Sequence, residues 1–125
     1  MKYFLDTYAL VEILHDNPLY QKYKEEELQT TLFNLYELYF SLLKTYNTEI
    51  AKVMFYKFFE SCIEINEEHI FAAAAFKLEH KKTNISYVDA LGYAIAKKEG
   101  MRFLTGDKEF KEIPNVEFVT KHLYR

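Results

Sequence analysis

Apolar residues in this chain follow two alternating spacings. Short apolar runs bounded by polar residues predict strands, and longer stretches with apolar residues every three or four positions predict helices. The predicted strands cover 2–6, 28–32, 62–65, 102–107 and 116–120. The predicted helices cover 7–16, a short segment opened by Pro18, 33–46, 48–61, 67–82 and 86–100, the last with Ser86 as N-cap and Gly100 just past its end. Strands that alternate with helices indicate an α/β sandwich around a mostly parallel sheet.

Length and charge narrow the class of protein. The chain has 125 residues, which suits a single domain spanning 1–125. Half of the residues are hydrophobic and 18% are aromatic, enough for a packed core with apolar surface left for a partner. The net charge of -3 excludes binding of nucleic acid by bulk positive charge, so such contacts require local lysines.

The start of the chain and its cysteine content bear on location. Cys62 is the only cysteine, so the chain has neither an internal disulfide nor a cysteine metal cluster. Asp6 interrupts the apolar start, which makes it a poor signal peptide, and no uncharged stretch approaches the length of a membrane span. These features predict a cytoplasmic protein.

Four acidic residues fall at matching ends of predicted elements. Asp6 ends the first strand, Asp107 follows the fourth, and Asp89 lies in the first turn of the helix between them. Glu37 lies about one turn into the helix after the second strand, within the apolar segment NLYELYF. The carboxyl ends of parallel strands share one sheet edge, where ligands bind. Four carboxylates gathered there repel one another and need a cation, for which Mg²⁺ or Mn²⁺ is suited.

Helix capping offers an alternative explanation for three of these acids. Asp6 and Asp107 each precede a helical segment, and Asp89 follows Ser86 by three positions. Capping is the better explanation for each aspartate taken singly, and an exposed helix position is the alternative for Glu37. One metal pocket explains all four at once, so we favour it.

Four segments together resemble the PIN domain, and most of all the VapC-type toxin ribonucleases. They are FLDTYALVEIL, NLYELYF, ISYVDALGYAIAKKEG and FLTGDKEFKEIPNVEFV, and the resemblance covers essentially the whole chain. It implies a three-layer α/β/α sandwich with a five-stranded sheet in the order 3-2-1-4-5. It also implies a homodimer and an inhibitory antitoxin protein that inserts a segment into the site. In TGDKEF the chain departs from the many members that have a second Asp after the first.

The resemblance assigns roles to individual residues. Asp6, Glu37, Asp89 and Asp107 match the acids of the metal site, and Thr7 matches a hydroxyl residue that positions the metal or its water. Thr105 matches a small polar position before the last acid, and Glu109 matches a further acid of some members. The implied activity is endoribonuclease hydrolysis of RNA dependent on Mg²⁺ or Mn²⁺, by the toxin of a type II toxin–antitoxin pair. The nearby lysines expected to contact RNA phosphates are Lys108, Lys111, Lys81 and Lys82.

Acids at strand ends in an α/β chain are also typical of phosphoryl-transfer enzymes. A haloacid-dehalogenase-like phosphatase needs a second Asp two positions after Asp6, where the chain has Tyr8. A receiver domain needs an Asp at the end of the third strand, where the chain has Asn66. The stronger alternative is a catalytically silent PIN-like module that binds RNA or protein. The four histidines lack ligand spacing and are expected to be structural or at the surface; they are His15, His69, His80 and His122.

Overall fold

A computed structural model describes residues 1–120 and contains a four-stranded parallel sheet. The strands are β1 (Lys2–Leu5), β2 (Glu27–Gln29), β3 (Arg102–Thr105) and β4 (Val116–Phe118), in the order β2-β1-β3-β4. The α-helices are α1 (Thr7–Leu14), α2 (Leu32–Leu43), α3 (Thr48–Tyr56), α4 (Glu67–Glu79) and α5 (Tyr87–Lys98). Three 3₁₀ helices complete the described chain: η1 (Pro18–Glu25), η2 (Phe59–Ser61) and η3 (Lys108–Phe110). The predicted α/β fold with a parallel sheet is confirmed.

The prediction of a third strand at 62–65 is wrong. Cys62 makes a single parallel bridge to Thr30, supported by the hydrogen bond from Ile63 N to Thr30 O at 2.9 Å. The segment therefore lies beside β2, where the predicted order placed it. It is too short to form a ladder because the side chain of Asn66 already accepts a hydrogen bond from the backbone of His69 and starts α4.

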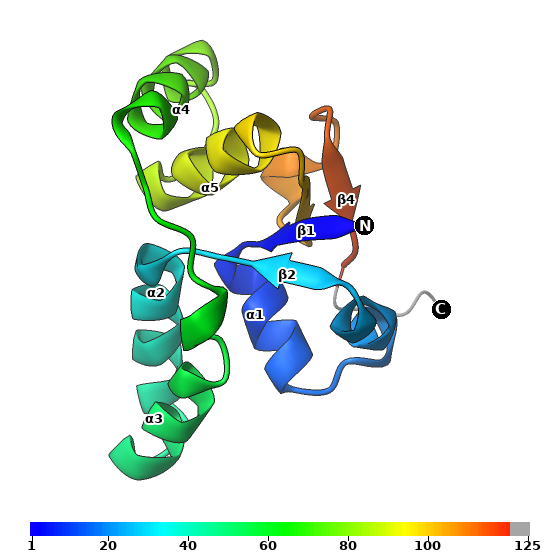
Figure 1. Ribbon diagram of the computed structural model, residues 1–125, viewed down its shortest axis with the longest axis vertical. Helices are drawn as coiled ribbons and strands as arrows, with labels where there is room; N and C mark the ends of the chain where they lie inside the picture. Colours follow the sequence, from blue (N-terminus) through cyan, green and yellow to red (C-terminus); the bar gives the residue numbers. More distant parts are fainter. Residues whose placement is uncertain (121–125) are drawn as a thin grey trace.

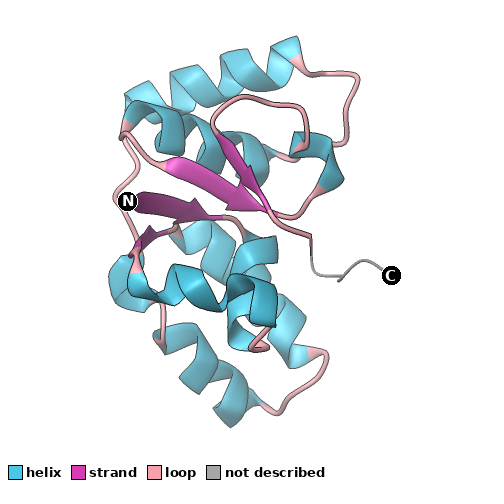
Figure 2. Cartoon of the chain, turned by 90° about the vertical axis from the view of Figure 1, so that its right-hand side faces the viewer, coloured by secondary structure: helices cyan, strands magenta, loops and turns pink. Residues whose placement is uncertain are grey.

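Helices cover both faces of the sheet (Figures 1 and 2). Alternate residues of β1 belong to opposite cores, as the period of a strand requires. Tyr3 and Leu5 pack with α1 and α2 on one face. Phe4 packs with α5 on the other, and α4 lies outside α5. β1 lies between β2 and β3 and is buried on both faces, so hydrogen bonds and packing fix the position of its carboxyl end.

Helix ends differ from the predictions by a few residues. α5 begins after Ser86, whose Oγ accepts from Asp89 N at 3.1 Å, and Gly100 follows the helix with a φ of 71°, as expected. α4 ends at Glu79, short of the predicted boundary at 82, and α3 passes into η2 before 61. Among the described residues, no helix is long and apolar enough to cross a membrane.

Candidate active site

Asp6 lies where β1 passes into α1, and its carboxylate accepts hydrogen bonds from both α1 and β3. Its Oδ1 accepts from Ala9 N at 2.8 Å, which caps α1. Its Oδ2 accepts from the hydroxyl of Thr105. The pairing of Leu5 with Leu104 in adjacent strands brings these side chains together, and only 2% of Asp6 is exposed. Capping and membership of the acid cluster are therefore compatible.

The end of β3 places Asp107 beside this carboxylate. Asp107 N donates to Thr105 Oγ1 at 3.0 Å, and Asp107 Oδ1 caps η3 by accepting from Glu109 N at 2.9 Å. Between Thr105 and Asp107, Gly106 lets the backbone pass close to Val119, because a Cβ there would lie 2.5 Å from the carbonyl oxygen of Val119. Glu109 itself accepts from Asn84 N at 3.1 Å and ties η3 to the loop before α5.

Glu37 is partly buried on α2, and its carboxylate has a partner. Thr7 Oγ1 donates to Glu37 Oε1 at 2.6 Å. The Thr7 oxygen also accepts from Asn34 Nδ2 at 3.2 Å. A hydrogen bond from α1 thus allows an acid to sit among the apolar residues of α2.

Electrostatics connect all four acids. Burial raises the pKa of Asp6 to about 8, and the charges of Asp89 and Asp107 add to this rise against the lowering effect of the hydrogen bonds from Thr105 and Ala9. Burial also raises the pKa of Asp89 to about 6, with contributions from Asp107 and Glu37. The four predicted acids therefore act on one another across a single edge of the sheet.

This cluster has the chemistry of a site for a hydrated divalent ion. Within residues 1–120, no three His, Cys, Asp or Glu side chains are grouped so that they could hold an ion between them. The donors are oxygens, and Mg²⁺ binds through one or two carboxylates while it keeps several of its waters. The residues therefore fit an ion held in part through its water shell.

The predicted phosphate-binding lysines are exposed near this edge or at a helix end. Lys108 is the first residue of η3 and Lys111 is its C-cap, while Lys81 and Lys82 follow α4. In the described part of the chain, no ion pair involves any of the four. Their charges are available to a ligand.

The sequence pattern did not identify two polar residues at the start of α2, the N-cap Thr31 and Asn34. Thr31 and Asn34 are fully buried, and Thr31 Oγ1 caps the helix by accepting from Asn34 N at 3.2 Å. The signal was the spacing in TLFNLYE, where Asn34 precedes Glu37 by about one helical turn.

The described histidines have no part in the acid cluster. His69 is buried, accepts from Asn66 N through Nδ1 at 3.1 Å, and contacts Glu99 through Nε2 at 2.8 Å. Its structural role agrees with the prediction. His80 Nδ1 lies 2.9 Å from Phe76 O, and His15 is the exposed C-cap of α1. His122 lies outside the described residues.

A parallel sheet with four acids at one edge agrees with what sequence comparison finds. The model of the PIN domain matches residues 3–116, so the chain belongs to the PIN-domain family. Comparison with curated protein sequences gave no match.

Similar solved structures include toxin–antitoxin proteins, several of them titled VapBC or VapC. A toxin–antitoxin complex from Klebsiella pneumoniae is 20% identical with a TM-score of 0.73, over 96% of this chain and 98% of that chain. VapBC2 from Rickettsia felis, solved with a DNA fragment from its promoter, is 24% identical with a TM-score of 0.69, over 96% and 98%. VapC20 from Mycobacterium tuberculosis, described as a sarcin–ricin loop cleaving toxin, is 18% identical with a TM-score of 0.70, over 94% and 96%.

Proposed function

We propose that this protein is a divalent-metal-dependent endoribonuclease and the toxin of a type II toxin–antitoxin pair. The observation that supports this best is the buried Asp6, whose carboxylate faces the charges of Asp89 and Asp107 at the carboxyl edge of the sheet. A structural acid gains nothing from like charges at close range, whereas a cation site requires them.

The residues divide into three proposed roles. Asp6, Asp89 and Asp107 would hold Mg²⁺ or Mn²⁺, directly or through water, and the bound ion would offset phosphate charge and acidify water. Glu37 would hold a metal-bound water or accept the proton of the attacking water, with Thr7 holding its carboxylate in place. Thr105 would support Asp6 and Asp107, Glu109 would hold the adjacent loop, and the exposed lysines would contact RNA phosphates.

Cleavage of RNA should require Mg²⁺ or Mn²⁺ and stop when EDTA is added, because the acid cluster offers only oxygen donors. When water attacks phosphorus, the P–O3′ bond breaks and the 3′ oxygen takes a proton. Mapping the fragment ends should therefore show 5′-phosphate and 3′-hydroxyl groups. A 2′,3′-cyclic phosphate would mean that the RNA's own 2′-hydroxyl attacked, which would contradict this mechanism.

A matched pair of variants separates this proposal from a catalytically silent PIN-like module. Glu37→Gln removes the proposed proton acceptor, whereas Glu25→Gln makes the same charge change at an exposed position before β2, at the opposite end of the strands. We expect loss of cleavage in the first variant and retention in the second. Metal-dependent RNA binding without cleavage by the unaltered protein would favour the silent module.

An antitoxin is the partner that similar proteins suggest. The structures from Klebsiella pneumoniae and Rickettsia felis are both toxin–antitoxin assemblies. An antitoxin segment that enters the acid edge would restrain the nuclease. Both proteins would act in the cytoplasm, where a free thiol such as that of Cys62 persists.

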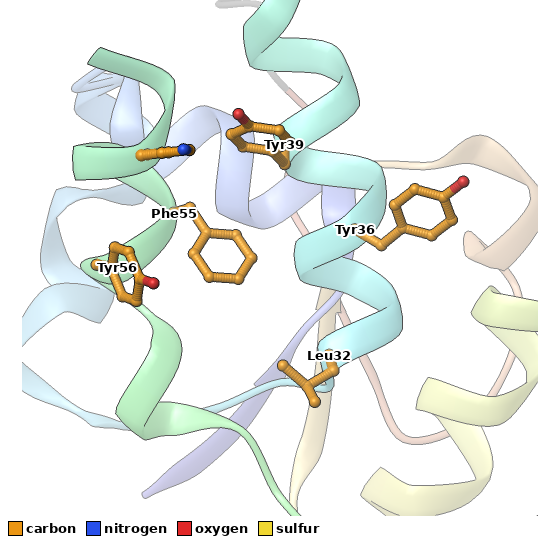
Figure 3. A pocket seen from close by; sticks show the side chains of 6 residues that line it. Leu32, Tyr36, Tyr39, Phe55 and Tyr56 are labelled. Carbon is orange, nitrogen blue, oxygen red and sulfur yellow. The ribbon is translucent and has the colours of Figure 1, made fainter. Parts of the chain in front are cut away.

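The α2–α3 surface is the proposed homodimer interface. Figure 3 shows the aromatic groove between the two helices, in which Tyr39 and Phe55 meet at 6.0 Å between ring centroids. Large apolar side chains remain exposed on these helices, among them Tyr36 at 73% and Val53 at 63%. One small sheet leaves this surface uncovered, and a second copy would bury it.

Light scattering of the protein at tens of micromolar should therefore give the mass of two chains. Val53→Glu places a charge in the proposed interface and should give the mass of one chain. Phe71→Glu is a matched control on α4, because Phe71 is also 63% exposed. A monomer mass for the unaltered protein, or dissociation by the Phe71 variant alone, would rule out this interface.

A further inference from the structure

A line of four polar side chains runs through the buried start of α2 to Glu37. Thr31 Oγ1 donates to Asn34 Oδ1 at 2.6 Å, and Asn34 Nδ2 donates to Thr7 Oγ1 at 3.2 Å. Thr7 Oγ1 then donates to Glu37 Oε1 at 2.6 Å. Every hydrogen bond points the same way, from the helix cap toward the carboxylate.

The direction of this line depends on Asn34. The Glu37 carboxylate can only accept, so Thr7 uses its single proton on Glu37 and the amide nitrogen of Asn34 must face Thr7. The amide oxygen of Asn34 then faces the hydroxyl of Thr31, which donates to it and accepts from Asn34 N. The amide then occupies a lone pair of the Thr7 oxygen. The hydroxyl proton of Thr7 is left free to point at Glu37.

Burial makes this arrangement more than a local contact. The exposed fractions of Thr31 and Asn34 are both 0%, so water cannot replace a lost partner in the line. An apolar residue is the usual occupant of a fully buried helix position. A buried amide that aims a hydroxyl at an acid of the candidate site therefore needs a reason beyond packing.

We propose that Asn34 is a positioning residue that holds Glu37 in its working orientation by fixing the hydroxyl of Thr7. Asn34 acts through Thr7 and touches neither substrate nor metal. The importance of this role for catalysis rests on the proposed nuclease function. The dependence of the Glu37 carboxylate on Asn34 through Thr7 can be measured in the metal-free protein.

A double-mutant cycle with Asn34→Leu and Thr7→Val tests the dependence directly. The first observable is the ¹³C resonance of the Glu37 side-chain carboxyl group in the metal-free protein. Asn34→Leu should shift this resonance, because the Thr7 hydroxyl is then free to rotate away. The same substitution in a Thr7→Val background should shift it no further.

The second observable is Mn²⁺ affinity by calorimetry. Loss of a residue that orients a metal-site side chain costs about 10- to 100-fold in affinity or activity. We expect Asn34→Leu to weaken Mn²⁺ binding within that range in the Thr7 protein and to have little effect in the Thr7→Val protein. Tyr93→Phe is the control. Tyr93 is on α5 and donates its hydroxyl to Pro114 O at 2.6 Å, so the substitution removes a side-chain hydrogen bond that is not one of those leading to Glu37.

Each outcome decides the question. The role of Asn34 is supported if Asn34→Leu shifts the Glu37 resonance and weakens Mn²⁺ binding in the Thr7 protein but not in the Thr7→Val protein. An unchanged Glu37 resonance, or effects that add fully to those of Thr7→Val, would overturn it and leave Asn34 as a packing residue. If Asn34→Leu fails to fold, Asn34→Ala removes the same amide without added bulk and takes its place in the cycle. Absence of metal-dependent cleavage by the unaltered protein would remove the proposed function alone, because the carboxyl resonance still reports on Asn34.

Discussion

Asp6→Asn should stop metal-dependent RNA cleavage while leaving the metal-free protein more stable than the unaltered protein at neutral pH. Activity should fall by at least about 100-fold, the upper end of the cost of losing an outer-shell metal partner. The neutral amide still accepts from Ala9 N and caps α1. It leaves the Thr105 hydroxyl without its acceptor, at about 1 kcal/mol. The larger effect is removal of an acid that burial and like charges disfavour in its ionised form.

Melting curves with and without Mn²⁺ measure both halves of this prediction. The unaltered protein should gain about 2.7 kcal/mol at 100 times the dissociation constant, and Asp6→Asn should gain much less. Glu25→Gln provides the control for a change of one charge, since Glu25 is exposed. If Asp6→Asn melts lower than the unaltered protein at neutral pH and Mn²⁺ stabilises neither, Asp6 is a helix cap and no more.

The metal-free protein should lose stability as pH rises from about 4 to about 8. The folded pKa of Asp6 is about 8, above the ordinary carboxyl value of 3.8. Between these values the folded state keeps a proton that the unfolded state releases, so the free energy of unfolding decreases by up to about 1.4 kcal/mol per pH unit. Asp89, with a pKa raised to about 6, acts in the same direction over the lower half of this range. The stabilisation is complete below about pH 4 and is lost as pH passes through 8.

Urea unfolding at several pH values checks this profile. Asp6→Asn should make the profile nearly flat above pH 6, because only Asp89 then remains and its contribution ends near its pKa of about 6. Near pH 4 the variant should be the less stable protein by about 1 kcal/mol, because the lost acceptor of Thr105 is then the main difference. Saturating Mn²⁺ should reduce the fall, because the ion replaces the proton as the partner of the carboxylates. Stability that rises from pH 4 to pH 8 in the metal-free protein would mean that Asp6 is paired rather than desolvated.

The sequence was sufficient to predict the fold class because the signals for it are local. Short apolar runs and helical spacing identify β1 and α5 without knowledge of the rest, and alternation of the two elements defines a parallel sheet. The prediction of a strand at 62–65 was wrong because β-propensity does not determine where a strand ends. Asn66 is the N-cap of α4, so the helix begins before the segment can form a strand ladder.

The positions of the acids could be predicted from the topology of the sheet, but the hydrogen bonds that hold their side chains could not. Asp6 and Asp107 follow neighbouring parallel strands, so the pattern alone places them at one edge. The dependence of Glu37 on Thr7 and Asn34 joins α1 to α2, and no sequence spacing reveals a contact between helices. A helical spacing from Asn34 to Glu37 shows that both share a face, but not that the face meets Thr7.

The hydrogen bond between Thr105 and Asp6 joins residues 99 positions apart. During synthesis the chain therefore carries Asp6 from its first residues but receives the hydroxyl partner only when β3 has been made. Contacts of such long sequence separation form late, because the entropic cost of closing the loop comes before the contact can stabilise the chain. A growing or prematurely ended chain that stops before β3 lacks one side of the acid edge. The proposed nuclease site is therefore incomplete until β3 has joined β1.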